Sequence, residues 1–185
     1  MKYRVVRTNV DPVTLDETKQ HCRVTDTRED SIIRTYIRSA VLQAENYIDQ
    51  LIMSGRVEEE YASFETGGFK TKYQVNSLPI IKYYDKDGVQ QTLSTDVYTY
   101  QVQDNYAKIV LKEDQVWPET EKDRPLSITI TYDSGMTDNR EEVPTDIKSA
   151  IFLIVNRMYE NRADYVDKLP TASKNILHPY RRNWL

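Results

Sequence analysis

Apolar residues recur at intervals of three and four over residues 33–51, and this pattern constrains the fold more than any other feature of the chain. The spacing places these side chains along one face of an α-helix of about five turns. The positions are Ile33, Tyr36, Ile37, Ala40, Val41, Ala44, Tyr47, Ile48 and Leu51. An apolar face of this length requires another long element to cover it. We expect the helix to end at Gly55, because glycine commonly follows a last helical turn.

A second helical pattern, nearer the C-terminus, supplies the covering element. Its apolar positions are Ile147, Ile151, Ile154, Val155 and Met158. Pro144 suits the first turn of this helix, where a missing N–H group would have no partner in any case. No other segment shows helical spacing over a comparable length. We therefore predict that the two long helices pack against each other in antiparallel orientation.

A shorter helix is expected before the first long one. Thr14 and Glu17 have the spacing of a capping box, in which the two side chains satisfy each other's backbone N–H groups. This helix should run to about Cys22, and residues 27–30 supply the next helix start. The helical core is thus predicted to contain two long helices and one short helix.

Between the long helices the apolar periodicity changes to two, which indicates strands. The expected strands are residues 61–64, 69–75, 78–84, 89–93, 97–102, 107–111 and 126–132, with a weaker edge strand at residues 3–6. Gly67 and Gly68 are expected to form a hairpin turn between the first two of the seven. Residues 85–88 should form the turn before the strand at 89–93. In residues 126–132, Leu, Ile, Ile and Tyr should share one face, and Gly135 should end the strand.

These elements predict an α+β fold: an antiparallel helical core with a β-rich insertion and an extended C-terminal tail. A length of 185 residues suits one domain of this kind. We assign residues 1–162 to a single domain. Its helical core is residues 12–55 and 143–162, and the β-rich insertion is residues 56–135. Residues 163–185 form the tail.

The sequence lacks the residue combinations of a catalytic or metal site. His21 and His178 are far apart and have no Cys or His at ligand spacing, and Cys22 is the only cysteine. We therefore predict no enzyme activity, no metal and no cofactor. The glutamates at 58–60 are interpreted as a solvated charge run, and Trp117 as a packing anchor at the end of a strand.

Charge and hydropathy limit the function further. The net charge is −4, with −5 in residues 57–125 and +3 in residues 156–185. The longest apolar run, residues 150–155, is far shorter than the about 20 residues that span a bilayer. Residues 1–5 lack the apolar core of a signal peptide. We expect a soluble chain with no membrane association, made in the cytoplasm.

The tail ends in an aromatic and basic sequence that resembles a docking segment. The candidate partner-binding residues are Ile176, Leu177, Pro179, Tyr180, Arg181, Arg182, Trp184 and Leu185. Two alternatives stay open from the residues alone, because such a tail either docks on a partner or folds back on its own domain. The basic residues of this region, interleaved with tyrosines, also suit nucleic-acid binding, although the acidic remainder of the chain would repel phosphate.

Several stretches, in order along nearly the whole chain, resemble the head–tail connector proteins of tailed bacteriophages, also called adaptor or head-completion proteins. The matching stretches are residues 12–19, 23–24, 29–33, 44–47, 78–81, 84–88, 117–118, 130–135, 143–151, 159–162, 169–170 and 176–181. The most specific are the Val143-Pro144 helix, Tyr159-Glu160-Asn161-Arg162 and Pro179-Tyr180-Arg181. Residues 56–77 depart from the family pattern, being longer and more charged.

The resemblance implies a structural virion protein at the head–tail interface, made in the host bacterial cytoplasm. Such proteins form a homo-oligomeric ring of about twelve copies beneath the portal protein and extend the DNA channel. A stopper or tail-completion protein then assembles on the ring. Packaged DNA passes through without specific binding, and the tail would dock on the portal. The alternatives are a stopper or a tail-completion (terminator) protein, and a DNA-binding packaging or regulatory factor whose DNA affinity would depend on salt.

Overall fold

The computed structural model describes residues 2–103, 106–121, 124–162 and 169–182. The chain forms two compact units. The strand unit comprises Met1–Arg7 and Ser54–Gly135, and the helical unit comprises Thr8–Met53 and Met136–Leu185. Each unit is therefore built from segments that are far apart in the sequence.

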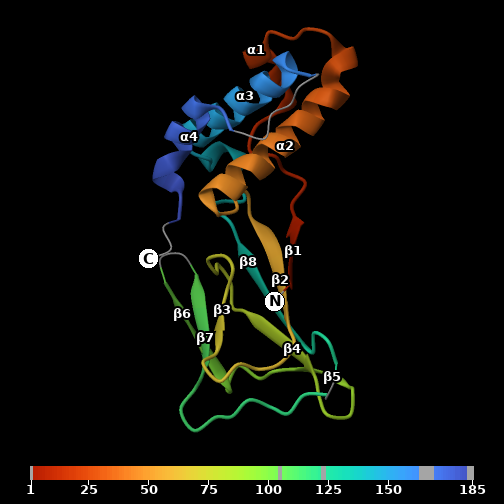
Figure 1. The fold of residues 1–185 in the computed structure, drawn as a ribbon, viewed down its shortest axis with the longest axis vertical. Helices are drawn as coiled ribbons and strands as arrows, with labels where there is room; N and C mark the ends of the chain where they lie inside the picture. Colours follow the sequence, from red (N-terminus) through yellow and green to blue (C-terminus); the bar gives the residue numbers. More distant parts are fainter. Residues whose placement is uncertain (1, 104–105, 122–123, 163–168, 183–185) are drawn as a thin grey trace. The chain divides into compact units, whose positions relative to one another are not determined.

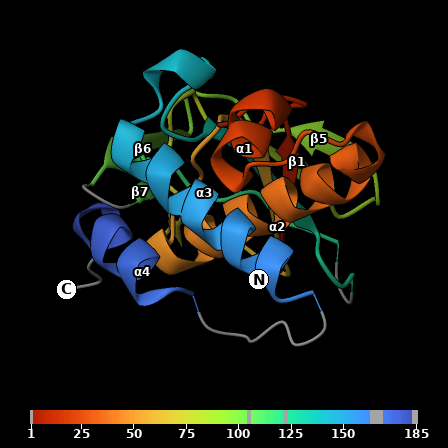
Figure 2. The same ribbon diagram turned by 90° about the horizontal axis from the view of Figure 1, so that it is seen from above.

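The described residues of the helical unit form four α-helices, which are α1 (Leu15–Cys22), α2 (Asp30–Ile48), α3 (Thr145–Glu160) and α4 (Thr171–Leu177). Short 3₁₀ turns, Thr27–Glu29, Arg140–Glu142 and His178–Tyr180, precede α2, precede α3 and follow α4. Helix α3 contacts each of the other three helices (Figures 1 and 2). The end of the α3 segment meets the start of α2 through an Arg162–Glu29 ion pair of 2.6 Å. The predicted antiparallel packing of the two long helices is thus confirmed.

The predicted apolar faces form the core of the helical unit. Ile33, Ile37, Ala44 and Ile48 of α2 are buried against Ile147, Ile151, Ile154, Val155 and Met158 of α3. Burial of side chains of this size contributes about 1.5–3 kcal/mol each relative to exposure. This contribution stabilises helices whose isolated sequences would be marginal in water.

The N-terminus of α1 has the predicted capping box. The Glu17 amide donates to the Thr14 hydroxyl at 3.1 Å, and the Thr14 amide donates to the Glu17 carboxylate at 2.6 Å. The hydrogen bonds from Thr14 lower the pKa of the Glu17 carboxyl. The helix ends at Cys22, as predicted, because Arg23 adopts a left-handed conformation with φ of 55°.

Helix α2 ends earlier than predicted. Asp49 adopts φ of 55° and its amide donates to the Glu45 carbonyl, so the last helical residue is Ile48. Aspartate tolerates this conformation better than most residues, which allows it to take the place expected of glycine. Gly55 instead lies in a strand, where an added Cβ atom would come within 3.1 Å of the Val6 carbonyl.

In the part of the strand unit that the structure describes, the strands form two antiparallel sheets (Figure 1). The five-stranded sheet has the order β1-β2-β8-β4-β5, and the three-stranded sheet has the order β3-β7-β6. The bounds are β1 Lys2–Arg7, β2 Gly55–Tyr61, β3 Phe69–Lys70, β4 Ile80–Tyr84, β5 Gln90–Thr92, β6 Tyr98–Val102, β7 Ala107–Leu111 and β8 Ile128–Ser134. The predicted edge position of the first strand is confirmed, as is the turn between β4 and β5. Strand β6 pairs with β7.

The predicted hairpin at Gly67 and Gly68 is wrong. Strand β2 pairs with β1 on one side and with β8 on the other, and β3 pairs with β7. Gly68 has φ of 80°, and a Cβ atom there would lie 2.1 Å from the Ile109 carbonyl oxygen of β7. A turn is present, because the Gly68 amide donates to the Glu65 carbonyl at 2.9 Å, but it does not join two paired strands. The glycine is needed for the positive φ and for the close approach to β7.

Strand β8 alternates as predicted, with Ile128, Ile130 and Tyr132 buried. Leu126, which was expected to belong to this alternation, lies before the strand, has a positive φ of 75° and is only partly buried. The α+β fold class is confirmed. The C-terminal part differs in one respect, since residues 171–177, expected to be extended, form α4.

Candidate partner-binding surfaces

The C-terminal segment packs on the helical unit. Leu177, the last residue of α4, is fully buried in the core of that unit. The Ser173 hydroxyl, also buried, donates to the Ala150 carbonyl of α3 at 3.3 Å. Pro170 precedes the first turn of α4, where its fixed φ suits helix initiation. Pro170 therefore stands at the start of a helix.

The residues after α4 are held by the end of α2. The Gln50 side-chain amide donates to the Tyr180 carbonyl at 2.7 Å, and the Arg182 amide donates to the Ile48 carbonyl at 3.0 Å. The Arg181 guanidinium lies 5.6 Å from the centre of the Tyr47 ring, within range of a cation–π contact. Of the two alternatives for the tail, residues 169–182 follow the second and fold back on their own chain.

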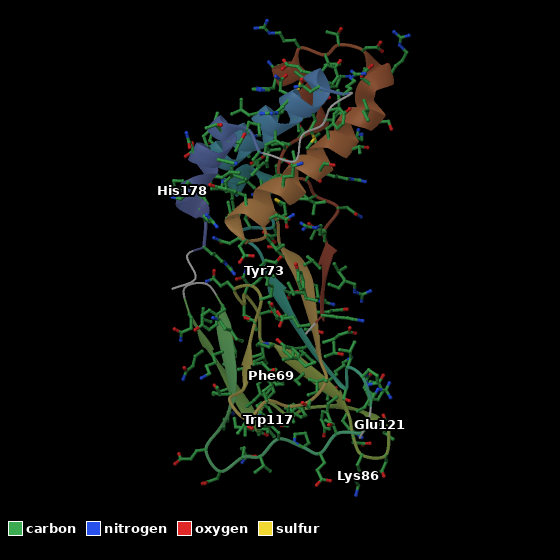
Figure 3. All side chains as sticks on the ribbon, in the orientation of Figure 1. Phe69, Tyr73, Lys86, Trp117, Glu121 and His178 are labelled. Carbon is green, nitrogen blue, oxygen red and sulfur yellow. The ribbon has the colours of Figure 1, made fainter. Side chains whose placement is uncertain are left out.

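The candidate partner-binding residues of the tail differ in accessibility. Leu177 and Arg182 are buried, Ile176 and Tyr180 are partly buried, and Pro179 and Arg181 are exposed. Trp184 and Leu185 lie outside the described residues. His178 is exposed beside Pro179 (Figure 3). The surface that this segment offers to a partner is therefore centred on the 178–181 turn, and its role in binding stays a prediction.

The sequence indicated that residues 58–60 form a solvated charge run. This interpretation is wrong for the middle residue. Glu59 is fully buried, because side chains alternate along β2 and this one faces the core of the strand unit. Its carboxylate accepts hydrogen bonds from the Tyr61 hydroxyl at 2.6 Å, from the Lys72 amide at 2.6 Å and from the Tyr132 hydroxyl. Such pairing is what allows a carboxylate to be buried.

The same arrangement keeps two tyrosines protonated. Burial, together with the negative charge of Glu59 and the hydrogen bonds to it, raises the pKa of the Tyr61 and Tyr132 hydroxyls far above 10. The Tyr132 hydroxyl also accepts a hydrogen bond from the Tyr73 amide at 3.1 Å. The network joins β2, β8 and the segment after β3, and its role is structural.

An aromatic cluster in the strand unit includes Trp117, which the sequence predicted to be a packing residue. Phe64 and Trp117 stack with ring centres 4.8 Å apart, and Phe69 meets both rings edge-on. The indole N–H of Trp117 donates to the Glu65 carbonyl at 3.1 Å. Phe69 is buried, whereas Phe64 and Trp117 are partly exposed. Trp117 therefore packs against other aromatic rings, and the two stacked rings are also partly open to solvent.

The outer side of this cluster borders a cleft of about 770 Å³. Its lining residues are Ser63, Phe64, Lys86, Pro118, Glu119, Thr120 and Glu121. Glu121 is tied to the end of β4, because its amide donates to the Tyr84 carbonyl at 3.1 Å. The Arg124 guanidinium bonds the Glu121 carboxylate at 2.9 Å and covers the Tyr84 ring at 3.4 Å. The sequence signal for this site was the long stretch between β7 and β8 without strand periodicity, around Trp117.

The 178–181 turn and the cleft beside Trp117 are surfaces on which a partner could bind. Among the described residues, the His, Cys, Asp and Glu side chains form no group of three suited to a metal. His21 stacks on Phe152 with ring centres 5.2 Å apart, and burial raises the pKa of the Cys22 thiol. In the part of the chain that the structure covers, none of the helices is sufficiently long and apolar to cross a membrane.

Comparisons with known proteins give a family and a set of similar folds. The family described as "Phage gp6-like head-tail connector protein" matches residues 12–113. The fold is similar to a chain in the "Neck of empty GTA particle computed with C6 symmetry", with a TM-score of 0.79 and 16% identity, covering 100% of this chain and 97% of that one.

Two further structures show the same similarity. They are the "Virion of native gene transfer agent (GTA) particle", with a TM-score of 0.78 and 16% identity, and the "Neck of native GTA particle computed with C12 symmetry", with 0.77 and 15%. Both comparisons cover 100% of this chain and 97% of the other. The comparison with curated proteins finds no match.

Proposed function

This chain belongs to the phage gp6-like head-tail connector family, which matches more than half of its length, and we propose that it forms a ring of about twelve copies beneath a portal protein. As a head-tail connector it is a structural protein that joins the head of a virion to its tail. The family match is the observation that carries the proposal. A stopper or tail-completion protein is the proposed partner on the other side of the ring.

The similarity in fold to neck structures supports the proposed ring. The similar chains come from particles of a gene transfer agent whose necks were computed with C6 and C12 symmetry. A closed ring requires two different surfaces on every subunit, one for each neighbour. The uneven charge of this chain, with −5 in residues 57–125 and +3 in residues 156–185, is compatible with such head-to-tail contacts.

The net charge of the chain also supports a proposal about DNA, namely that the ring does not bind it specifically. Lys and Arg contacts to phosphates supply most of the affinity of proteins for DNA in the absence of sequence recognition. A chain with a net charge of −4 offers few such contacts overall. We propose that packaged DNA passes through the ring without specific binding, with the ring acting as a wall of the channel.

We place the portal contact on the 178–181 turn. Pro179 and Arg181 are exposed there, whereas Leu177 fixes the turn to the helical core from inside. A rigidly held turn loses less conformational entropy on binding than a free tail. Arg181 would supply a charge-assisted contact, and we include Trp184 and Leu185, which lie outside the described residues, among the proposed partner-binding residues on the basis of the sequence alone.

Imaging of the complex tests this function. The protein is mixed with the portal protein from the same genome and examined by negative-stain electron microscopy. A ring of added density at one end of the portal is expected, and its symmetry gives the copy number. Absence of binding to a well-formed portal would contradict the connector function, whereas binding only to a tail tube would favour the tail-completion alternative.

A matched pair of variants tests the portal contact separately. Arg181→Glu should reduce portal binding at least tenfold, because it reverses the charge at the centre of the proposed surface. Arg157→Glu makes the same change at an exposed position of α3 and should bind like the wild type. Equal binding by both variants would remove the 178–181 turn from the contact.

A further inference from the structure

One edge of the five-stranded sheet is open. Strand β1 pairs with β2 alone among the described strands, so the other side of β1 presents backbone N–H and C=O groups. Tyr3 is 49% exposed and Val6 is 47% exposed on this strand. Basic side chains commonly protect such edges from pairing, and Lys2, Arg4 and Arg7 are present here. Protection of the edge explains the basic residues, but it does not explain why Tyr3 and Val6, which lie between them, are exposed.

The cleft lies beside the turn that joins β4 to β5, the two strands farthest from β1 in the same sheet. Strand β5 is the last strand of the sheet, and the β4–β5 turn contributes Lys86 to the cleft wall. In Figure 3, Lys86, Glu121 and Trp117 lie at one end of the strand unit. The cleft thus combines apolar surface from Phe64 and Pro118 with the carboxylates of Glu119 and Glu121.

The loop beside the cleft is unusual in length and composition. Residues 112–121 contain no regular strand or helix, and Val116 within them is 79% exposed, directly before Trp117. Long irregular loops in compact domains are commonly functional. Tryptophan is enriched among the residues that dominate protein–protein binding energies. The loop also carries Glu113 and Asp114 in addition to the two glutamates of the cleft.

The β1 edge and the surface around the cleft are complementary in charge. Residues 2–7 contain three basic residues and no acidic ones. Lys86 and the 112–121 loop together contribute two basic and four acidic residues around the cleft. A basic strand with exposed apolar residues therefore matches a surface with an acidic excess and an apolar wall, and both are on the same unit.

We propose that the partner of the cleft is β1 of a second copy of this chain. In the ring, the β1 edge of each subunit would lie against the cleft and the 112–121 loop of the next subunit. The β1 edge and the cleft with its loop are two different surfaces of one unit, as a head-to-tail ring requires. The inference rests on the proposed ring and names the surfaces that close it.

Cross-linking tests this contact in the assembled ring. All variants carry Cys22→Ser, which removes the only natural cysteine. Val6→Cys and Val116→Cys are combined in one chain, the rings are assembled on the portal, and a short bis-maleimide is added. A ladder of covalent oligomers larger than dimers is expected, because each chain is joined to two neighbours.

Controls separate the contact from chance reactions. Each single-cysteine variant should give dimers at most. The pair Val6→Cys and Val102→Cys replaces the loop position by one that is 50% exposed on β6, in the other sheet, and should give no ladder. Rings that form normally while the Val6–Val116 pair yields no ladder would overturn the inference and leave the connector function standing. Absence of any ring on the portal would overturn both.

A charge exchange gives a second readout. Lys2→Glu and Glu119→Lys each place like charges across the proposed contact, and each should reduce ring formation several-fold. The double variant restores opposite charges and should recover most of the ring yield, provided that circular dichroism shows all variants folded. Additive losses in the double variant would contradict the contact.

Discussion

At the scale of single residues, Glu59 is the side chain that links the strands of the strand unit through hydrogen bonds. It lies between two glutamates on β2, and only the alternation of side chains distinguishes it from its neighbours. Two tyrosine hydroxyls and one backbone amide surround its carboxylate. A run of three identical residues therefore contains two surface positions and one core position, and the core position is the one that holds separate strands together.

Replacement of Glu59 should be costly. Glu59→Ala removes the acceptor for three buried donors, and we expect the free energy of unfolding to fall by about 3 kcal/mol. Trp117 fluorescence during urea denaturation, in a Trp184→Phe background, reports on the strand unit. Glu60→Ala, which changes an outward position on the same strand, should stay within about 0.5 kcal/mol of the wild type. Similar values for both variants would mean that the network contributes no stability.

The tyrosines of this network should make the protein sensitive to alkaline pH. Their pKa values are raised in the folded state, so the folded protein retains protons that the unfolded chain releases above pH 10. Stability is then fully present below pH 10 and falls above it, by about 1.4 kcal/mol per pH unit for each tyrosine. Urea denaturation between pH 8 and 11 measures this slope. Tyr132→Phe should reduce it and Tyr3→Phe should not, and an unchanged slope in Tyr132→Phe would refute the assignment.

At the scale of elements, α4 shows how packing changes the role of a short segment. Residues 171–177 have little helical pattern of their own, and a helix of this length is unstable in isolation. Burial of Leu177 against α2 and α3 and the hydrogen bond from Ser173 to Ala150 supply the stability. Deletion of the C-terminal segment would therefore remove part of the core together with the proposed portal contact.

A point substitution separates these two effects. Leu177→Ala leaves a cavity in the core of the helical unit, and we expect a loss of about 3 kcal/mol in the free energy of unfolding. His178→Ala, at the adjacent exposed position, should change stability by less than about 0.5 kcal/mol. Thermal denaturation followed by circular dichroism compares the two. A native-like stability of Leu177→Ala would show that α4 is not anchored in solution.

At the scale of the whole molecule, the chain passes between its two units near residues 7, 53 and 135. Each unit consequently contains sequence from both sides of the other, which makes contacts of long sequence separation obligatory. The similarity to neck structures at 16% identity extends over 100% of the chain. Such low identity with a shared fold is expected where apolar spacing, rather than residue identity, specifies the core. The family assignment and the proposed ring both depend on the fold of the whole chain.

The sequence by itself determined three of the four described helices, most of the described strands and the fold class. Apolar spacing acts locally, so α2, α3 and β8 were predicted, and Thr14 and Glu17 marked the start of α1 because a capping box lies within four residues. The sequence also indicated the function, because it lacks catalytic motifs and because stretches that resemble connector proteins follow one another in order along the chain.

The tertiary structure alone decided which elements meet. Nothing local distinguishes Glu59 from its neighbours, and Gly68 marked a close approach to β7 where a hairpin was expected. Strand partners and a C-terminal helix depend on contacts between residues distant in sequence, because backbone hydrogen bonds and apolar surface are satisfied wherever a partner is available. The cleft beside Trp117 was also decided by the tertiary structure, because Phe64, Lys86 and Glu121 become neighbours only in the folded strand unit.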